Sequence, residues 1–146
     1  MLSWIGRTAV VGAIVFAALP VSAQTCSGLK VVGGPGYQVQ KKVSVPGAGP
    51  IARHNWNTDF SASGYSSYVA TITPLNEGLY SIQMNLKYQN DSVDKVFNEK
   101  IQLRKGQTFK IRGSSRVSGS PYQVNLSVGG VEVVGNTYRA SVTGCR

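Results

Sequence analysis

Every second residue from Tyr80 to Tyr88 is apolar, and every residue between them is polar. Successive side chains of a β-strand point to opposite faces of a sheet, so this period of two predicts a strand with one buried face and one solvated face. Shorter runs of the same alternation recur along the chain, and no useful stretch after residue 24 has the period of an amphipathic helix. The chain is therefore predicted to be all-β, with further strands within 29–32, 37–45, 68–72, 97–103, 109–111, 122–128 and 138–142.

Turn-forming residues separate these segments. The stretches 74–78, 90–92, 104–107, 129–130 and 135–136 each contain Gly, Pro, Asn or Asp, which favour tight turns. The Gly-Gly pair at 129–130 suits a two-residue turn between two strands. About seven to nine short strands spaced in this way predict an antiparallel β-sandwich of immunoglobulin-like architecture. A small β-barrel is the alternative.

The first 23 residues are predicted to be a signal peptide. Arg7 carries the only charged side chain among the first 29 residues, and an apolar run follows it at 8–19. Small residues then lead to Ala23, so we expect cleavage after Ala23 and one mature domain at 24–146. The apolar run is shorter than the roughly 20 residues that span a bilayer, which disfavours an uncleaved membrane anchor. We therefore expect an exported protein, periplasmic or secreted, with no stable membrane span after cleavage.

The two cysteines lie near opposite ends of the predicted mature chain, with Cys26 near its start and Cys145 at its penultimate position. In an oxidising compartment such a pair predicts a disulfide bond that joins the first strand to the last. A metal pair or a redox site is the alternative, but the chain has a single histidine and no C-x-x-C motif.

Catalytic and cofactor chemistry is not expected. The chain has one His and six acidic residues, so few groups can transfer protons. His54 and Asp59 lie five residues apart near several serines, but the G-x-S-x-G nucleophile motif is missing. The glycine-rich stretch 33–36 lacks the Lys and the helix of a phosphate loop, and 90–94 lacks the closing Glu of a calcium loop. We therefore expect no enzyme activity, no cofactor and no metal site.

The segment 46–66 has no clean alternation and is predicted to be a long loop or crossover. Long ordered loops on a rigid sheet often carry binding residues, and the candidates in this one are His54, Trp56, Asp59 and Tyr65. A carbohydrate-binding module would need Trp56 and Tyr65 to be exposed and coplanar. The alternative is that Trp56 and Phe60 only plug one open end of the sandwich.

Most of the tyrosines are predicted to be interior residues. Their positions share the phase of the core residues in the alternating runs, so they are expected to pack inside and not to stack on sugars. These residues are Tyr68, Tyr80, Tyr88, Tyr122 and Tyr138.

Positive charge is concentrated in one part of the chain. Lys and Arg outnumber Asp and Glu by 15 to 6, and seven of the basic residues lie between 95 and 116 with the single acid Glu99. If 97–103 and 108–112 form an antiparallel hairpin, their outward side chains are neighbours on one face. This hairpin face is a predicted binding surface for an anionic macromolecule, made of Lys95, Lys100, Arg104, Lys105, Lys110, Arg112 and Arg116. The alternative is that these cations only keep the protein soluble and prevent sheet edges from pairing.

Two resemblances accompany these patterns. The stretch 97–113 (FNEKIQLRKGQTFKIRG) resembles the strand, K-G-Q-T turn and strand near the sheet lip of bacterial secretin subunits. It covers 17 residues and implies a local hairpin. The overall plan, a small exported sandwich without catalytic residues, is similar to periplasmic accessory proteins of curli assembly.

Together the patterns predict an exported, non-catalytic binding protein of the bacterial envelope or the extracellular space. The expected partner is a protein or an anionic polymer. Nucleic acid is not expected as a physiological partner, because export carries the chain away from it. The alternatives are a carbohydrate-binding module and an accessory, chaperone-like factor for envelope or surface-fibre assembly, for which an unpaired sheet edge should be exposed.

Overall fold

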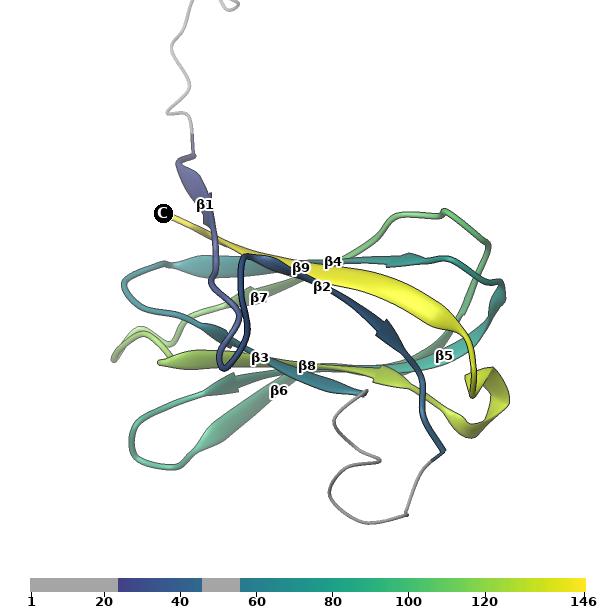
Figure 1. Ribbon diagram of the computed structural model, residues 1–146. Helices are drawn as coiled ribbons and strands as arrows, with labels where there is room; N and C mark the ends of the chain where they lie inside the picture. Colours follow the sequence, from purple (N-terminus) through teal and green to yellow (C-terminus); the bar gives the residue numbers. More distant parts are fainter. Residues whose placement is uncertain (1–23, 46–55) are drawn as a thin grey trace, which may run out of the picture.

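The computed structural model describes residues 24–45 and 56–146, which form two antiparallel sheets packed face to face (Figure 1). Sheet A contains β1 (Cys26–Gly28), β2 (Gln38–Lys42), β4 (Ser67–Pro74), β7 (Phe109–Ser114) and β9 (Thr137–Cys145). Sheet B contains β3 (Asn57–Ser61), β5 (Gly78–Lys87), β6 (Val93–Leu103) and β8 (Gln123–Gly129). A single 3-10 turn, η2 (Val131–Val133), joins β8 to β9. The predicted all-β antiparallel sandwich is confirmed.

The last strand, β9, lies at the centre of sheet A. It pairs with β4 on one side and with both β1 and β2 on the other, so the sheet runs β1 and β2, then β9, β4 and β7. In sheet B the order is β3, β8, β5 and β6. The strands β6 and β7 are therefore the edges of the two sheets on one side of the sandwich, and β2 and β3 are edges on the other.

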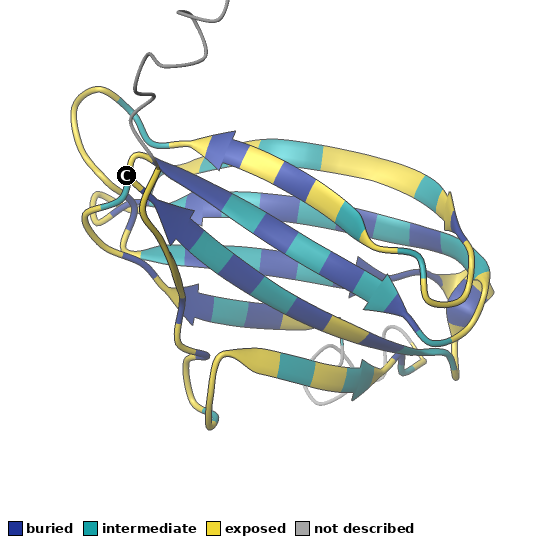
Figure 2. Cartoon of the chain, turned by 90° about the horizontal axis from the view of Figure 1, so that it is seen from above, coloured by how far each residue is buried: buried dark blue, intermediate teal, exposed yellow. Residues whose placement is uncertain are grey.

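The core lies between the sheets and follows the period of two. In β5, the residues Tyr80, Ile82, Met84 and Leu86 are fully buried, while the residues between them are half-exposed. Strand β4 faces them from sheet A and buries Tyr68, Ala70 and Ile72, as the alternation of colours along the strands in Figure 2 illustrates. Burial of large apolar side chains is the main force that holds such layers together.

Four of the five tyrosines predicted to be interior are buried, and Tyr122 is the exception. The residue is 38% exposed. Tyr122 precedes the first residue of β8 and lies at the end of the layer. The apolar–polar alternation of β8 thus extends to Tyr122, but this residue lies beyond the part of the strand that the other sheet covers.

The predicted hairpin between 97–103 and 108–112 is wrong. Strand β6 pairs with β5 and strand β7 pairs with β4, so the turn at 104–107 carries the chain from sheet B to sheet A. The apolar faces of the two strands meet across the sandwich, where the rings of Phe97 and Phe109 pack edge to face with centroids 5.8 Å apart. Two adjacent strands show the same apolar–polar alternation whether they pair as a hairpin or lie in facing sheets. The sequence pattern therefore could not distinguish these two arrangements. The same correction applies to 129–130, because η2 and not a two-residue hairpin turn follows β8 there.

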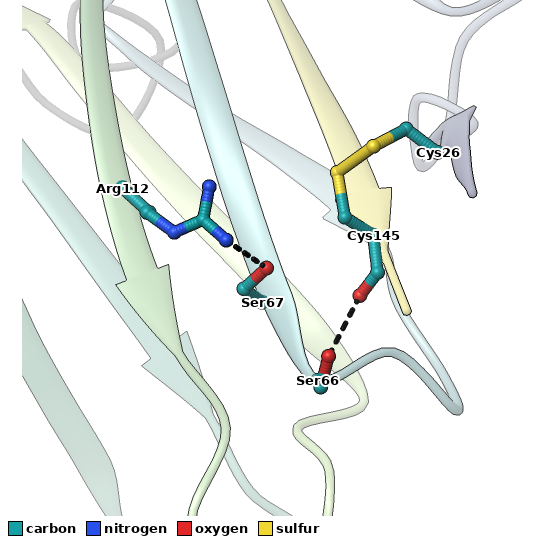
Figure 3. The surroundings of a disulfide bond; sticks show 5 residues. All are labelled: Cys26, Ser66, Ser67, Arg112 and Cys145. Atoms are coloured by element: carbon teal, nitrogen blue, oxygen red, sulfur yellow. Dashed lines mark hydrogen bonds between the residues drawn. A yellow bond between two sulfur atoms is a disulfide. The ribbon is translucent and has the colours of Figure 1, made fainter. Parts of the chain in front are cut away.

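The predicted disulfide between Cys26 and Cys145 is confirmed. The two cysteines lie opposite each other in the pairing of β1 with β9, so the bond joins the first strand of sheet A to the last (Figure 3). Beside it, the Ser66 hydroxyl donates a hydrogen bond of 3.1 Å to the carbonyl oxygen of Cys145. Neither described segment, 24–45 or 56–146, contains a helix of the length and hydrophobicity needed to cross a membrane.

Candidate binding surface

The outer face of sheet A follows from the register of its strands. Residues that lie opposite each other in antiparallel strands point to the same face. Since Ala70 and Ile72 of β4 point into the core, Val69, Thr71 and Thr73 point outwards. The pairings of β4 with β7 and β9, and of β9 with β2, extend this outer face to the neighbouring strands. Its further residues are Lys110 and Arg112 of β7, Thr137, Arg139, Ser141 and Thr143 of β9, and Gln38, Gln40 and Lys42 of β2.

Four cations stand on this face: Lys42, Lys110, Arg112 and Arg139, called here the cationic face. All four are exposed. Figure 2 views sheet A from this side. The Arg112 guanidinium donates a hydrogen bond of 3.1 Å to the hydroxyl of Ser67 (Figure 3), and Arg139 donates one of 3.0 Å to the side-chain oxygen of Gln40. Both arginines are therefore held along the sheet surface and not extended into solvent.

No acidic residue stands on the outer face of sheet A. All six acids of the chain lie in the described part, in β3, β6, η2 or the connections that flank β5. Three of them form the ion pairs Lys87–Asp59, Lys100–Glu132 and Arg116–Asp94, none of which includes a member of the cationic face. The positive charge of this face is thus uncompensated by any carboxylate within residues 24–45 and 56–146.

Neutral hydrogen-bonding groups fill the space between the four cations. Threonine and serine hydroxyls stand on the two central strands, and glutamine amides stand on β2. A shallow hollow of about 180 Å³ lies among them, lined by Gln38, Thr71, Thr73, Arg139, Ala140 and Ser141. The surface therefore offers fixed positive charge together with many donors and acceptors.

The structure divides the seven residues of the predicted hairpin face among different surfaces. Only Lys110 and Arg112 lie on the cationic face. Lys95 lies opposite Asn85 and Lys100 opposite Ser81, which places both on the outer face of sheet B. The physical reason is that β6 and β7 belong to different layers, so their outward side chains point in opposite directions. The prediction of one continuous surface is wrong.

The remaining three members of the predicted hairpin face lie outside the strands. Arg104 and Lys105 lie in the turn between β6 and β7, and Arg116 follows β7. Sequence reasoning missed Arg139 and Lys42. Both occupy polar positions within segments that were predicted to be strands, but only the strand order shows that they share a face with β7.

Arg116 belongs to a structural clamp at one end of the sandwich. Its Nε and Nη2 donate hydrogen bonds of 3.0 and 2.7 Å to the two carboxylate oxygens of Asp94. Its guanidinium also lies over the ring of Tyr88, 3.9 Å from the centroid, in a cation–π contact. The hydrogen bonds from Arg116, with its charge, hold the pKa of the Asp94 carboxyl below its usual range. This arginine is therefore committed to holding the loop after β7 against β6.

Replacing Asp94 with Asn is expected to lower the melting temperature at neutral pH and to have no effect in acid. Because the pKa of Asp94 is depressed in the folded state, the ion pair stabilises the fold above the unfolded pKa of about 4. That contribution is lost as the pH falls through the lower folded pKa. Thermal melts at a series of pH values from neutral to about 2 should show the melting temperatures of wild type and Asp94→Asn converging as the pH falls. Asp91→Asn, in the neighbouring turn, is the control, and a difference between wild type and Asp94→Asn that stays constant down to that pH would contradict the clamp.

The predicted loop residues do not form one site. His54 lies outside the described residues. Trp56 is half-buried, packs against Gly129 and donates a hydrogen bond of 2.8 Å from its ring nitrogen to the carbonyl of Ser44. Gly129 lies opposite Ser81 near the start of β5, and a Cβ at Gly129 would meet the Trp56 ring, so the ring lies directly against this part of β8. Trp56 therefore has a packing contact with the sandwich and is not part of an exposed binding platform.

Tyr65 lies at the other end of the sandwich. It packs against Gly144, which is opposite Tyr68 near the start of β4, and the Arg146 guanidinium lies 4.5 Å from the centre of its ring. Trp56 and Tyr65 therefore cannot form a shared coplanar platform. Asp59 is not in a loop either, since it lies in β3 on the outer face of sheet B, where Asn125 donates a hydrogen bond of 3.0 Å to it.

In the described part of the chain, no three His, Cys, Asp or Glu side chains come together as a metal site requires.

The sequence matches no protein-family profile and no curated protein. Several solved structures are similar in shape. One is a mutant of CBM29-2, a family 29 carbohydrate-binding module, with 7% identity and a TM-score of 0.38; the match covers 60% of this chain and 61% of that module. Another is the CBM22-1 xylan-binding domain of Paenibacillus barcinonensis Xyn10C, with 12% identity, a TM-score of 0.41 and 84% of each chain covered. A third is infectious bursal disease virus, Gt strain, with 8% identity, a TM-score of 0.38 and coverage of 85% of this chain and 32% of the viral chain. These likenesses assign no ligand to the present chain.

Proposed function

We propose that this protein is an exported, non-catalytic binding protein that holds an anionic polymer at the bacterial envelope or outside the cell. The observation that carries the proposal is the separation of charge between the two sheets. The outer face of sheet A has four cations and no acid, whereas lysines near sheet B are paired with Asp59 and Glu132. Uncompensated positive charge on one face attracts anionic partners and orients their approach.

The spread of the cations favours a polymer over a small anion. Lys42 and Lys110 stand on β2 and β7, which are separated by three steps between neighbouring strands. At about 4.8 Å per step, the two edges lie roughly 14 Å apart, so a single phosphate or carboxylate cannot contact both. Each exposed charge contact contributes little by itself, and a chain with repeated charges combines several of them.

An open sheet edge provides some support for a second candidate, the accessory factor that binds by adding a strand. Among the described residues, β2 pairs only with β9, so its other side is unpaired. However, Lys41 of β2 points inwards and Glu99 of the edge strand β6 lies opposite the inward residue Ile82. Inward charges on edge strands are devices that prevent strand addition. The cationic face is therefore the stronger candidate.

The proposal is tested by measuring binding of the purified protein to polygalacturonate, with dextran as a neutral polymer of similar backbone chemistry. We expect binding to polygalacturonate that weakens steadily as salt is raised from about 0.05 to about 0.5 M, because salt screens exposed charges. We expect no comparable binding to dextran. An affinity that does not change with salt, or equal binding to both polymers, would rule out recognition through the cationic face.

A further inference from the structure

A groove separates the edge strands β2 and β3. It has a volume of about 540 Å³ and is lined by residues of β2, by the start of β3 and by the turn that precedes β2. In Figure 1, β2 runs obliquely from sheet A towards sheet B. The residues that line the groove place it along this side of the sandwich. Its lining combines apolar side chains (Val31, Val39 and Pro35) with polar ones (Gln38, Gln40, Lys41, Thr58 and Asp59).

Thr58 gives the groove an unsatisfied polar group. Its side chain is on the inward face of β3, the residue is only 6% exposed, and Oγ1 has no hydrogen-bond partner in the part of the chain that the structure describes. A buried hydroxyl without a partner costs free energy, and native structures retain such groups mainly where a ligand or water completes them. Thr58 therefore indicates a place where a bound molecule would supply the missing hydrogen bond.

Lys41 supplies a cation to the same groove. It lies opposite Tyr138 and so points inwards, and its Nζ donates a hydrogen bond of 2.8 Å to the carbonyl oxygen of Asn57 across the gap between the sheets. Burial lowers the pKa of Lys41, while the nearby Asp59 carboxylate acts in the opposite direction. The partly desolvated position strengthens the attraction of an ammonium group for an anionic group.

The mixture of surfaces fits a sugar ring that carries a carboxylate. A pyranose has apolar C–H faces and a rim of hydroxyls, which match the valines and the glutamine amides respectively. Its carboxylate would be drawn to Lys41. Gln38 lines both this groove and the hollow on the cationic face, so the two depressions meet at β2.

The geometry points to a uronate subsite: the groove between β2 and β3 takes one uronic acid unit of the anionic glycan that lies on the cationic face. This inference rests on the proposed function and names the class of polymer. The carboxylate pairs with Lys41, a ring hydroxyl hydrogen-bonds Thr58, and the rest of the polymer crosses β2 towards Arg139.

The test uses sodium D-galacturonate as the probe and follows the backbone amide signals of the purified protein by NMR. Galacturonate should shift the signals of groove residues, and D-galactose should bind at least roughly fivefold more weakly because it lacks the carboxylate. Lys41→Met should weaken galacturonate binding on the order of tenfold and Thr58→Val several-fold. Thr58→Val removes only a hydroxyl without a partner, so the fold should lose no stability.

Lys95→Met is the matched control, since Lys95 lies on the outer face of sheet B, outside both the groove and the cationic face. It should leave galacturonate binding unchanged. Equal losses in Lys41→Met and Lys95→Met, no loss in Thr58→Val, or equal binding of galactose would each overturn the subsite. These results differ from a failure of the proposed function, in which polygalacturonate binding is insensitive to salt while galacturonate still shifts the groove signals.

Discussion

Polygalacturonate should bind at least roughly tenfold more weakly when Lys110→Glu and Arg112→Glu are combined in one variant. Both side chains stand on the outer face of sheet A, where no carboxylate opposes them. Reversing both charges puts two anions on the path of the polymer and removes two of the four cations of the cationic face. Loss of about 1.4 kcal/mol of binding free energy corresponds to a tenfold weaker affinity. Titration calorimetry at low salt measures the change.

The matched control is Lys95→Glu combined with Lys100→Glu. It changes the net charge by the same amount, but both residues lie on the outer face of sheet B. The ion pair of Lys100 with Glu132 is exposed and 3.9 Å long, so its loss has little effect on the fold. Affinity should stay within about twofold of wild type. Equal weakening in the two variants would mean that net charge alone, and not the cationic face, governs binding.

Replacing both Cys26 and Cys145 with Ser should lower the melting temperature on the order of 10 °C. The bond closes a loop with a sequence separation of 119 residues, for which the chain-entropy model gives a stabilisation of about 4–5 kcal/mol. In a domain of this size, 1 kcal/mol shifts the melting temperature by a few degrees, and strain or residual structure reduces the full value. Differential scanning calorimetry measures the midpoint.

A reductant provides an independent check of the same bond. It should lower the midpoint of the wild-type protein towards that of the double variant, and it should leave the double variant unchanged. A wild-type midpoint that does not move in full reduction would show that the bond contributes nothing to stability. The two results together separate loss of the covalent bond from any effect of the serine side chains.

The strands and the buried face were predictable because alternation reports a local property. Tyr80, Ile82 and Met84 share one side of β5 whatever strand lies beside it. The choice of partner is a non-local property. Strands β6 and β7 are joined by a short turn, yet they enter different layers because Phe97 and Phe109 bury their rings against each other across the sandwich.

The candidate surface was only partly predictable for the same reason. Lys110 and Arg112 were identified from their outward phase, but Lys100 has the same phase and faces the other way. Lys95 reaches the outer face of sheet B through the register shift between Met84 and Asn85. Arg139 joins the surface through the pairing of β9 with β4, which no local pattern encodes. From the sequence alone, Trp56 is a candidate binding residue because it is aromatic and lies in a segment without alternation. The structure gives it a packing role, through its contact with Gly129.

The central place of β9 in sheet A has a consequence for how the protein acquires its shape. This nine-residue strand is the last of the described chain, and β1, β2 and β4 all hydrogen-bond to it. During synthesis or passage through a membrane channel, the N-terminal part of a chain emerges first. The strands β1, β2 and β4 then emerge before β9, the strand with which all three pair. Sheet A therefore assembles only once the C-terminal residues are released. A premature stop before residue 137 would accordingly yield a chain with unsatisfied strand edges that is prone to aggregate, not a shortened binding protein.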